Sequence, residues 1–83
     1  MKSLLLSLKD RLCQYCIEEK DETDLEQLEY LIELIDYFLT EKISLKDNLN
    51  IFIEDIIATA IIQVRFDLLD FVKPFSKEVS NYG

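Results

Sequence analysis

The chain contains no histidine, and its only glycine is Gly83 at the end of the sequence. Histidine is the side chain that most often transfers protons near neutral pH, and it is also a frequent metal ligand. Glycine-rich loops are the usual way to bring backbone N–H groups against a phosphate. These two absences exclude most catalytic and phosphate-binding arrangements, so the sequence points towards binding rather than chemistry.

Basic residues are also few: nine Lys and Arg stand against 17 Asp and Glu, which gives a formal net charge of −8. Such a charge repels nucleic acids and anionic lipid, and it attracts basic proteins. We therefore expect a basic protein as partner, with no direct nucleic-acid binding and no membrane binding. With 49% apolar residues, the 83-residue chain is too hydrophobic for a disordered acidic tail, and we expect one small folded domain.

The only two cysteines, Cys13 and Cys16, are too few for a disulfide framework. Their C-x-x-C spacing is used by redox dithiols and by zinc sites, but they lie well inside a predicted helix, away from the N-terminus that stabilises a thiolate. A four-ligand zinc site would need a second chain. We interpret both as small buried side chains, with a dimer-shared zinc site as the alternative, and we expect a cytoplasmic protein without cofactor or metal.

The spacing of apolar residues predicts an all-α fold, a small antiparallel bundle of three to four helices in a single domain over residues 1–83. The predicted helices cover residues 3–19, 24–40 and 45–73, followed by an irregular tail over residues 75–83. The first helix should bury Leu5, Leu8, Leu12, Tyr15 and Cys16. The second should bury Leu25, Leu28, Ile32, Ile35 and Leu39.

Capping residues mark the predicted helix ends. Thr23 and Glu26 fit a capping box at the start of the second helix, and Ser44 is a candidate N-cap for the third. An unbroken third helix that ends at Pro74 would be about 43 Å long, so it either breaks near residues 58–63 or packs its overhang on something else. Its uncharged stretch Ile56–Val64, too short to span a membrane, is either centrally buried or the seam of a homodimer.

Four carboxylates repeat at i, i+3, i+7 and i+10 along the second helix, which places them on one face: Glu26, Glu29, Glu33 and Asp36. Between Asp21 and Glu41 the chain has acidic residues and no basic one, whereas an ordinary solvated face mixes the two signs. This acidic row is either a solubilising surface or a binding surface. In the second case, Tyr30 and Tyr37 beside the row would be aromatic anchors.

Carboxylates can also act in catalysis. The di-metal centres of helical bundles use Glu-x-x-His motifs, which cannot occur without histidine. Acid–base catalysis needs a carboxyl group desolvated in a pocket, yet the acidic row is predicted to lie opposite the apolar face. We therefore predict no enzyme, with an all-carboxylate magnesium site as the remaining alternative.

The segment Leu34-Ile-Asp-Tyr-Phe-Leu-Thr-Glu-Lys-Ile-Ser44, followed by a predicted helix, resembles part of the colicin-D-type immunity proteins. The resemblance extends from Leu34 to about Phe52. Members of that family are small helical bacterial proteins, and their negative surface occupies the basic active site of a tRNA-cleaving toxin. The resemblance implies an immunity protein that neutralises a toxin nuclease. The alternatives are a structural or regulatory homodimer and a phage-type inhibitor that mimics nucleic acid.

Overall fold

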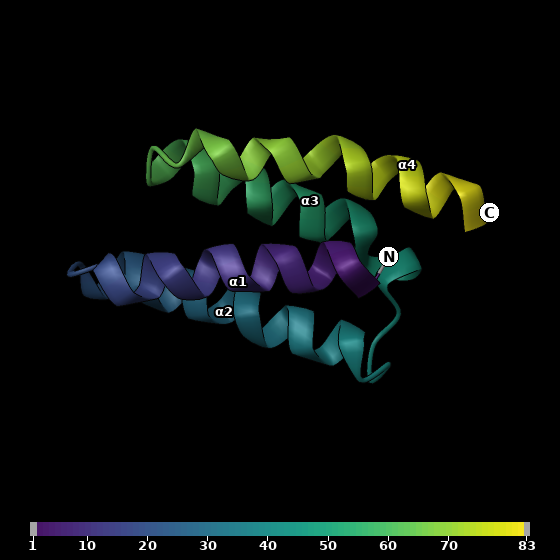
Figure 1. The fold of residues 1–83 in the computed structure, drawn as a ribbon, viewed down its shortest axis with the longest axis horizontal. Helices are drawn as coiled ribbons and strands as arrows, with labels where there is room; N and C mark the ends of the chain where they lie inside the picture. Colours follow the sequence, from purple (N-terminus) through teal and green to yellow (C-terminus); the bar gives the residue numbers. More distant parts are fainter. Residues whose placement is uncertain (1, 83) are drawn as a thin grey trace.

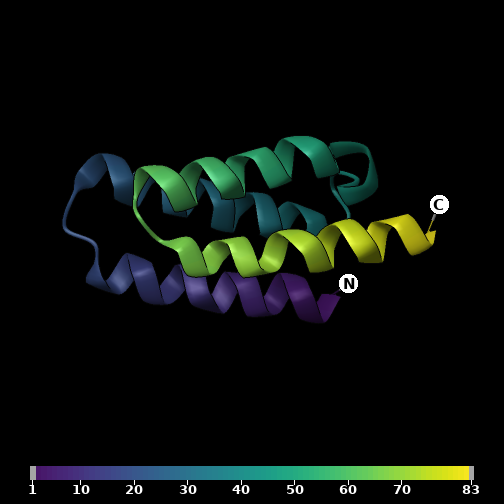
Figure 2. The ribbon, with the colours of Figure 1, turned by 90° about the horizontal axis from the view of Figure 1, so that it is seen from above.

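The computed structural model describes residues 2–82, and these form an all-α bundle, which confirms the predicted fold class. Four α-helices and one 3₁₀ helix cover this part of the chain: α1 (Lys2–Glu18), α2 (Glu22–Leu39), α3 (Leu45–Ile62), η1 (Phe66–Phe71) and α4 (Val72–Tyr82). Figure 1 shows α1 and α2 as one antiparallel pair, and α3 with the η1–α4 segment as a second. The view from above in Figure 2 shows the two pairs packed into one bundle. No helix within residues 2–82 has the length and apolarity to cross a membrane.

Every helix contributes to one core, and three phenylalanine rings connect its second half. The Phe38 ring meets Phe52 edge-on at 5.1 Å between centroids, and Phe52 meets Phe75 in the same way at 5.5 Å. These contacts join α2, α3 and α4, and edge-to-face packing is the favourable arrangement for such rings. The α1 helix adds three fully packed leucines, Leu5, Leu8 and Leu12.

The buried stripe of α2 is rotated from its predicted position. Leu28 and Ile35 are buried, as predicted. Leu31 and Phe38, which the predicted set omitted, are buried with them. The predicted Leu25, Ile32 and Leu39 are only half-buried. The reason is that α2 packs against α1 on one side and α3 on the other, so its most buried direction lies between the two neighbours.

The first turn of α2 begins earlier than the capping box predicted. The Asp21 carboxylate, and not Thr23, accepts a hydrogen bond from the Asp24 N–H at 3.0 Å. Aspartate is at least as good an N-cap as threonine, and it is followed by acidic residues that favour the helix N-terminus. At α3 the predicted cap is present, because Ser44 Oγ accepts from the Asp47 N–H at 3.3 Å.

The long third block folds back on itself. The α3 helix ends at Ile62, and after a turn at Gln63–Arg65 the chain returns along α3 as η1 and α4. Pro74 was predicted to end a helix, but it does not. It lies in the first turn of α4, where a missing N–H leaves no helical hydrogen bond unmade.

The predicted irregular tail is also wrong for residues 75–82, which belong to α4. Phe75 is fully buried, and this contact with the core explains why the segment is held in place. The last residue of the predicted tail, Gly83, lies outside the described residues.

The C-terminal ends of α2 and α3 each use a left-handed residue that is not glycine. Glu41 has φ 59° and Val64 has φ 55°. The following N–H groups close the turns: Lys42 N–H donates to Tyr37 O at 3.0 Å, and Arg65 N–H donates to Ala60 O at 2.8 Å. This is the Schellman pattern, in which glycine is the usual left-handed residue. The chain has no internal glycine, so side-chain-bearing residues adopt the strained conformation.

Candidate functional site

The outer face of α2 carries an unbalanced negative charge. Glu26, Glu29 and Glu33 are exposed there, and α2 contains no basic residue. Neither Glu26 nor Glu29 forms a hydrogen bond or ion pair with another residue in the described part of the chain. Their charges are therefore available to an external partner.

The fourth predicted member of the row, Asp36, is occupied within the protein. Lys9 Nζ on α1 lies 2.6 Å from Asp36 Oδ1. This hydrogen bond raises the pKa of the Lys9 ammonium. Within the acidic row, Glu26 and Glu29 are thus unpaired, whereas Asp36 joins α2 to α1. The sequence could not show this, because the Lys9–Asp36 contact depends on how the two helices align.

Tyr30 and Tyr37 lie on the flank of the same face, as predicted, and are 48% and 39% exposed. The Tyr37 hydroxyl donates to Glu33 Oε1 at 2.8 Å, and this hydrogen bond raises the pKa of Tyr37. Lys42 Nζ lies 5.8 Å from the centre of the Tyr37 ring, a distance at which a cation is attracted to the ring face.

A small hollow of about 150 Å³ lies on α2 between these side chains, lined by Tyr30, Glu33, Leu34 and Tyr37. Sequence reasoning named its two tyrosines and its glutamate but missed the hollow and Leu34. The i, i+3, i+4, i+7 spacing of the four residues was the signal that could have indicated a shared surface.

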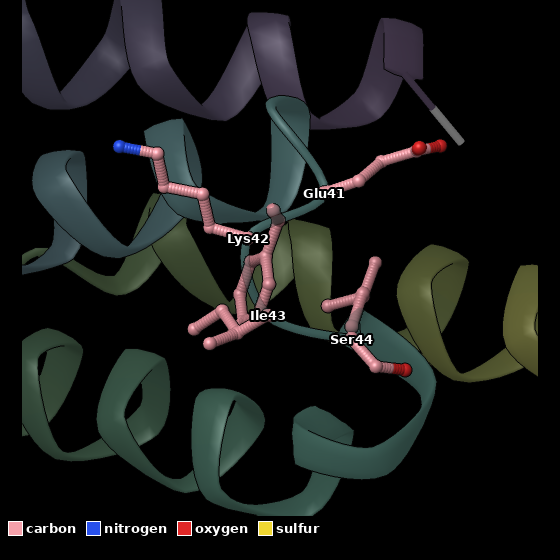
Figure 3. A pocket seen from close by; sticks show the side chains of 6 residues that line it. Glu41, Lys42, Ile43 and Ser44 are labelled. Carbon is pink, nitrogen blue, oxygen red and sulfur yellow. The ribbon is translucent and has the colours of Figure 1, made fainter.

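A larger hollow of about 400 Å³ lies at the α2–α3 loop, lined by Phe38, Glu41, Lys42, Ile43, Ser44 and Leu45. Figure 3 shows the Glu41 carboxylate and the Lys42 ammonium pointing in opposite directions from the loop. Acid–base catalysis needs titratable groups that converge on one point. This arrangement does not provide that convergence.

A second surface feature is apolar and lies at the turn between α3 and η1. Ile62 is 74% exposed and Val64 is 69% exposed, and Ile61 and Phe66 are also exposed. The predicted apolar stretch Ile56–Val64 is therefore divided, since Ile56, Thr59 and Ala60 face the core while its end faces solvent.

Beside this turn, Arg65 is held by α1 and the loop after it. Its guanidinium stacks 4.1 Å from the centre of the Tyr15 ring and bonds Glu19 Oε2 at 2.7 Å. The pKa of Glu19 is lowered, mainly because its carboxylate accepts a hydrogen bond from the Asp21 N–H. The hydrogen bond from Arg65 lowers it further. Asp67 on η1 similarly accepts from Arg11 and Tyr15 of α1. These charged contacts join helices to one another.

The cysteines show no reactive arrangement. Cys13 and Cys16 are free and half-buried, and burial raises the pKa of Cys16, which favours the neutral thiol. Among the side chains that the structure describes, those of residues 2–77, no group of three or more Cys, Asp or Glu is placed to hold a metal ion.

Comparisons with protein-family models, with curated proteins and with solved structures find no match for this chain. The resemblance to colicin-D-type immunity proteins therefore stays a prediction, and function is inferred from the charge and geometry of the α2 face.

Proposed function

We propose that this chain is a binding protein, and not an enzyme, whose acidic α2 face covers a basic surface on another protein. The observation that carries the proposal is the pair Glu26 and Glu29, exposed and unpaired beside Glu33 on a helix without basic residues. A negative surface of this kind accelerates encounter with a positive partner and disfavours partners of like charge.

The ion pairs elsewhere in the fold support this reading. Lys9, Arg11 and Arg65 each bond a carboxylate of another element. These three basic residues thus form contacts between elements. The part of the α2 face around Glu26 and Glu29 has no ion pair among the described residues, whereas a purely solubilising face would gain stability from ion pairs between neighbouring turns.

The most specific form of the proposal is an immunity protein that neutralises a nuclease toxin. A site that binds a nucleic-acid backbone is basic, and a row of carboxylates complements it. The resemblance of the segment from Leu34 to about Phe52 favours the same function. A phage-type inhibitor that mimics nucleic acid would present the same charge pattern and differ in its target.

The test is a pull-down from the native host with three forms of the tagged protein, washed at low salt and eluted on a salt gradient. The wild type should retain a basic protein, identified by mass spectrometry, and release it at moderate salt. The variant Glu26→Lys/Glu29→Lys should lose it. The control Asp10→Lys/Glu18→Lys makes the same charge change at exposed positions of α1 and should keep it. Equal retention by all three forms would refute the proposal.

A second candidate function is a structural or regulatory homodimer, favoured by the exposed apolar turn at Ile61, Ile62, Val64 and Phe66. Large exposed apolar groups that lie close together mark interaction surfaces in small domains. Sedimentation velocity over a range of protein concentrations decides this question. A dimer that dissociates on Ile62→Lys substitution would support this candidate, and a monomer at all concentrations would remove it.

A further inference from the structure

The hollow on α2 is lined by four side chains from neighbouring helical turns. Tyr30 and Tyr37 are seven residues apart, so their backbone positions lie two helical turns from each other on one side of α2. Glu33 and Leu34 fill the turn between them, and all four residues line the hollow. One leucine, two tyrosines and one glutamate therefore line a single space that is mostly apolar.

The volume of this space sets the size of what can enter. Small-molecule sites usually measure about 300–1,000 Å³, whereas a cavity of about 150 Å³ takes one benzene-sized group. The hollow, at about 150 Å³, is in the second class. It therefore suits one side chain of a protein partner better than a cofactor or metabolite.

The lining indicates the chemistry of that side chain. Tyrosine rings attract cations on their faces, and a guanidinium also stacks flat against them. Within this chain, the Lys42 ammonium already lies over the Tyr37 ring, yet Lys42 does not line the hollow and leaves it open. A guanidinium makes a similar contact elsewhere in this chain, because Arg65 stacks on the Tyr15 ring and also bonds the Glu19 carboxylate.

A hydrogen bond from Tyr37 holds the Glu33 carboxylate in one position. Tyr37 donates to Glu33 Oε1, which fixes the carboxylate beside the ring. A carboxylate offers about four acceptor positions, so Glu33 retains capacity for the donors of a guanidinium. We propose that the hollow receives one arginine side chain of the basic partner, whose guanidinium stacks on one of the two tyrosine rings and bonds Glu33. This inference rests on the proposed function and assigns the contact that fixes the position of the partner.

The test uses N-acetyl-arginine amide as the probe and its neutral citrulline analogue as the matched ligand, with NMR spectra of the full chain. Arginine amide should produce saturating shifts of the Tyr30 and Tyr37 ring signals and of the Leu34 methyl groups. Citrulline amide should not. Glu33→Gln should weaken the apparent affinity roughly tenfold, since a hydrogen bond to a charged group contributes on that order.

The control Glu18→Gln removes the same charge from an exposed position on α1 and should change the affinity less than about twofold, because distant exposed charges are screened. Equal shifts with citrulline, unchanged affinity in Glu33→Gln, or the absence of saturating shifts at the hollow would overturn the inference. The outcome is independent of the pull-down, because Glu26→Lys/Glu29→Lys does not alter the residues that line the hollow.

Discussion

Glycine at position 64 should make the protein more stable than alanine does, which is the reverse of the usual order. Val64 has φ 55° and is 69% exposed at the turn after α3. A residue with a Cβ loses about 1–2 kcal/mol in the left-handed region, and glycine avoids this cost. The larger freedom of glycine in the unfolded chain offsets about 0.5–1 kcal/mol of that gain.

The two variants Val64→Gly and Val64→Ala lose the same two methyl groups, so their comparison isolates the Cβ. The difference in the free energy of unfolding should be about 0.5–1 kcal/mol in favour of glycine, which corresponds to a Tm higher by a few degrees in a domain of this size. Urea unfolding followed by circular dichroism measures the free energy, and thermal unfolding measures the Tm.

Ala58 supplies the matched control, because it is exposed within the right-handed turns of the same helix. There the order should be normal, and Ala58→Gly should lower the free energy of unfolding by roughly 0.5–1 kcal/mol. If glycine were less stable than alanine by the same amount at both positions, the left-handed strain assigned to Val64 would be refuted.

Two further predictions concern the contacts that hold the bundle together. Glu19 has a lowered pKa in the fold, so its stabilising contribution is present above its ordinary pKa of 4.5 and is lost as the pH falls through the lower folded value. Wild type and Glu19→Gln should therefore differ in Tm at neutral pH and converge in acid, and a constant difference would contradict the assignment. Phe52→Ala removes the ring between Phe38 and Phe75 and should cost about 3–5 kcal/mol, a large fraction of the stability of a small domain. A cooperative unfolding transition with unchanged midpoint would disprove the central role of this ring.

Periodicity was enough to predict α1, α2 and the start of α3, because burial at 3.6-residue spacing is a local property, but it did not separate α3 from η1 and α4. It identified the buried leucines of α1 and the exposed glutamates of α2. It placed the buried stripe of α2 at the wrong angle around the helix axis. The sequence does not show that α2 packs against both α1 and α3. Pro74 was read as a stop signal, although the same residue is compatible with the first turn of a helix.

The parts of the candidate site that the sequence did not predict all depend on contacts between elements or on side-chain geometry. The pairing of Lys9 with Asp36 requires α1 and α2 to meet at one particular register. The hollow requires the orientation of Tyr37 towards Glu33, which the hydrogen bond between them fixes. Helical spacing places these residues on one face but does not determine either contact.

The association rate constant between this protein and the basic partner recovered from its host tests the central claim most directly. It should be measured by stopped flow from low to high ionic strength for the wild type and for Glu26→Lys/Glu29→Lys. The wild-type rate should fall steeply with salt, and at low salt the variant should associate at least roughly tenfold more slowly with a flatter salt dependence. An unchanged rate and an unchanged salt dependence in the variant would contradict the account, because the α2 face would then not be the surface that attracts the partner.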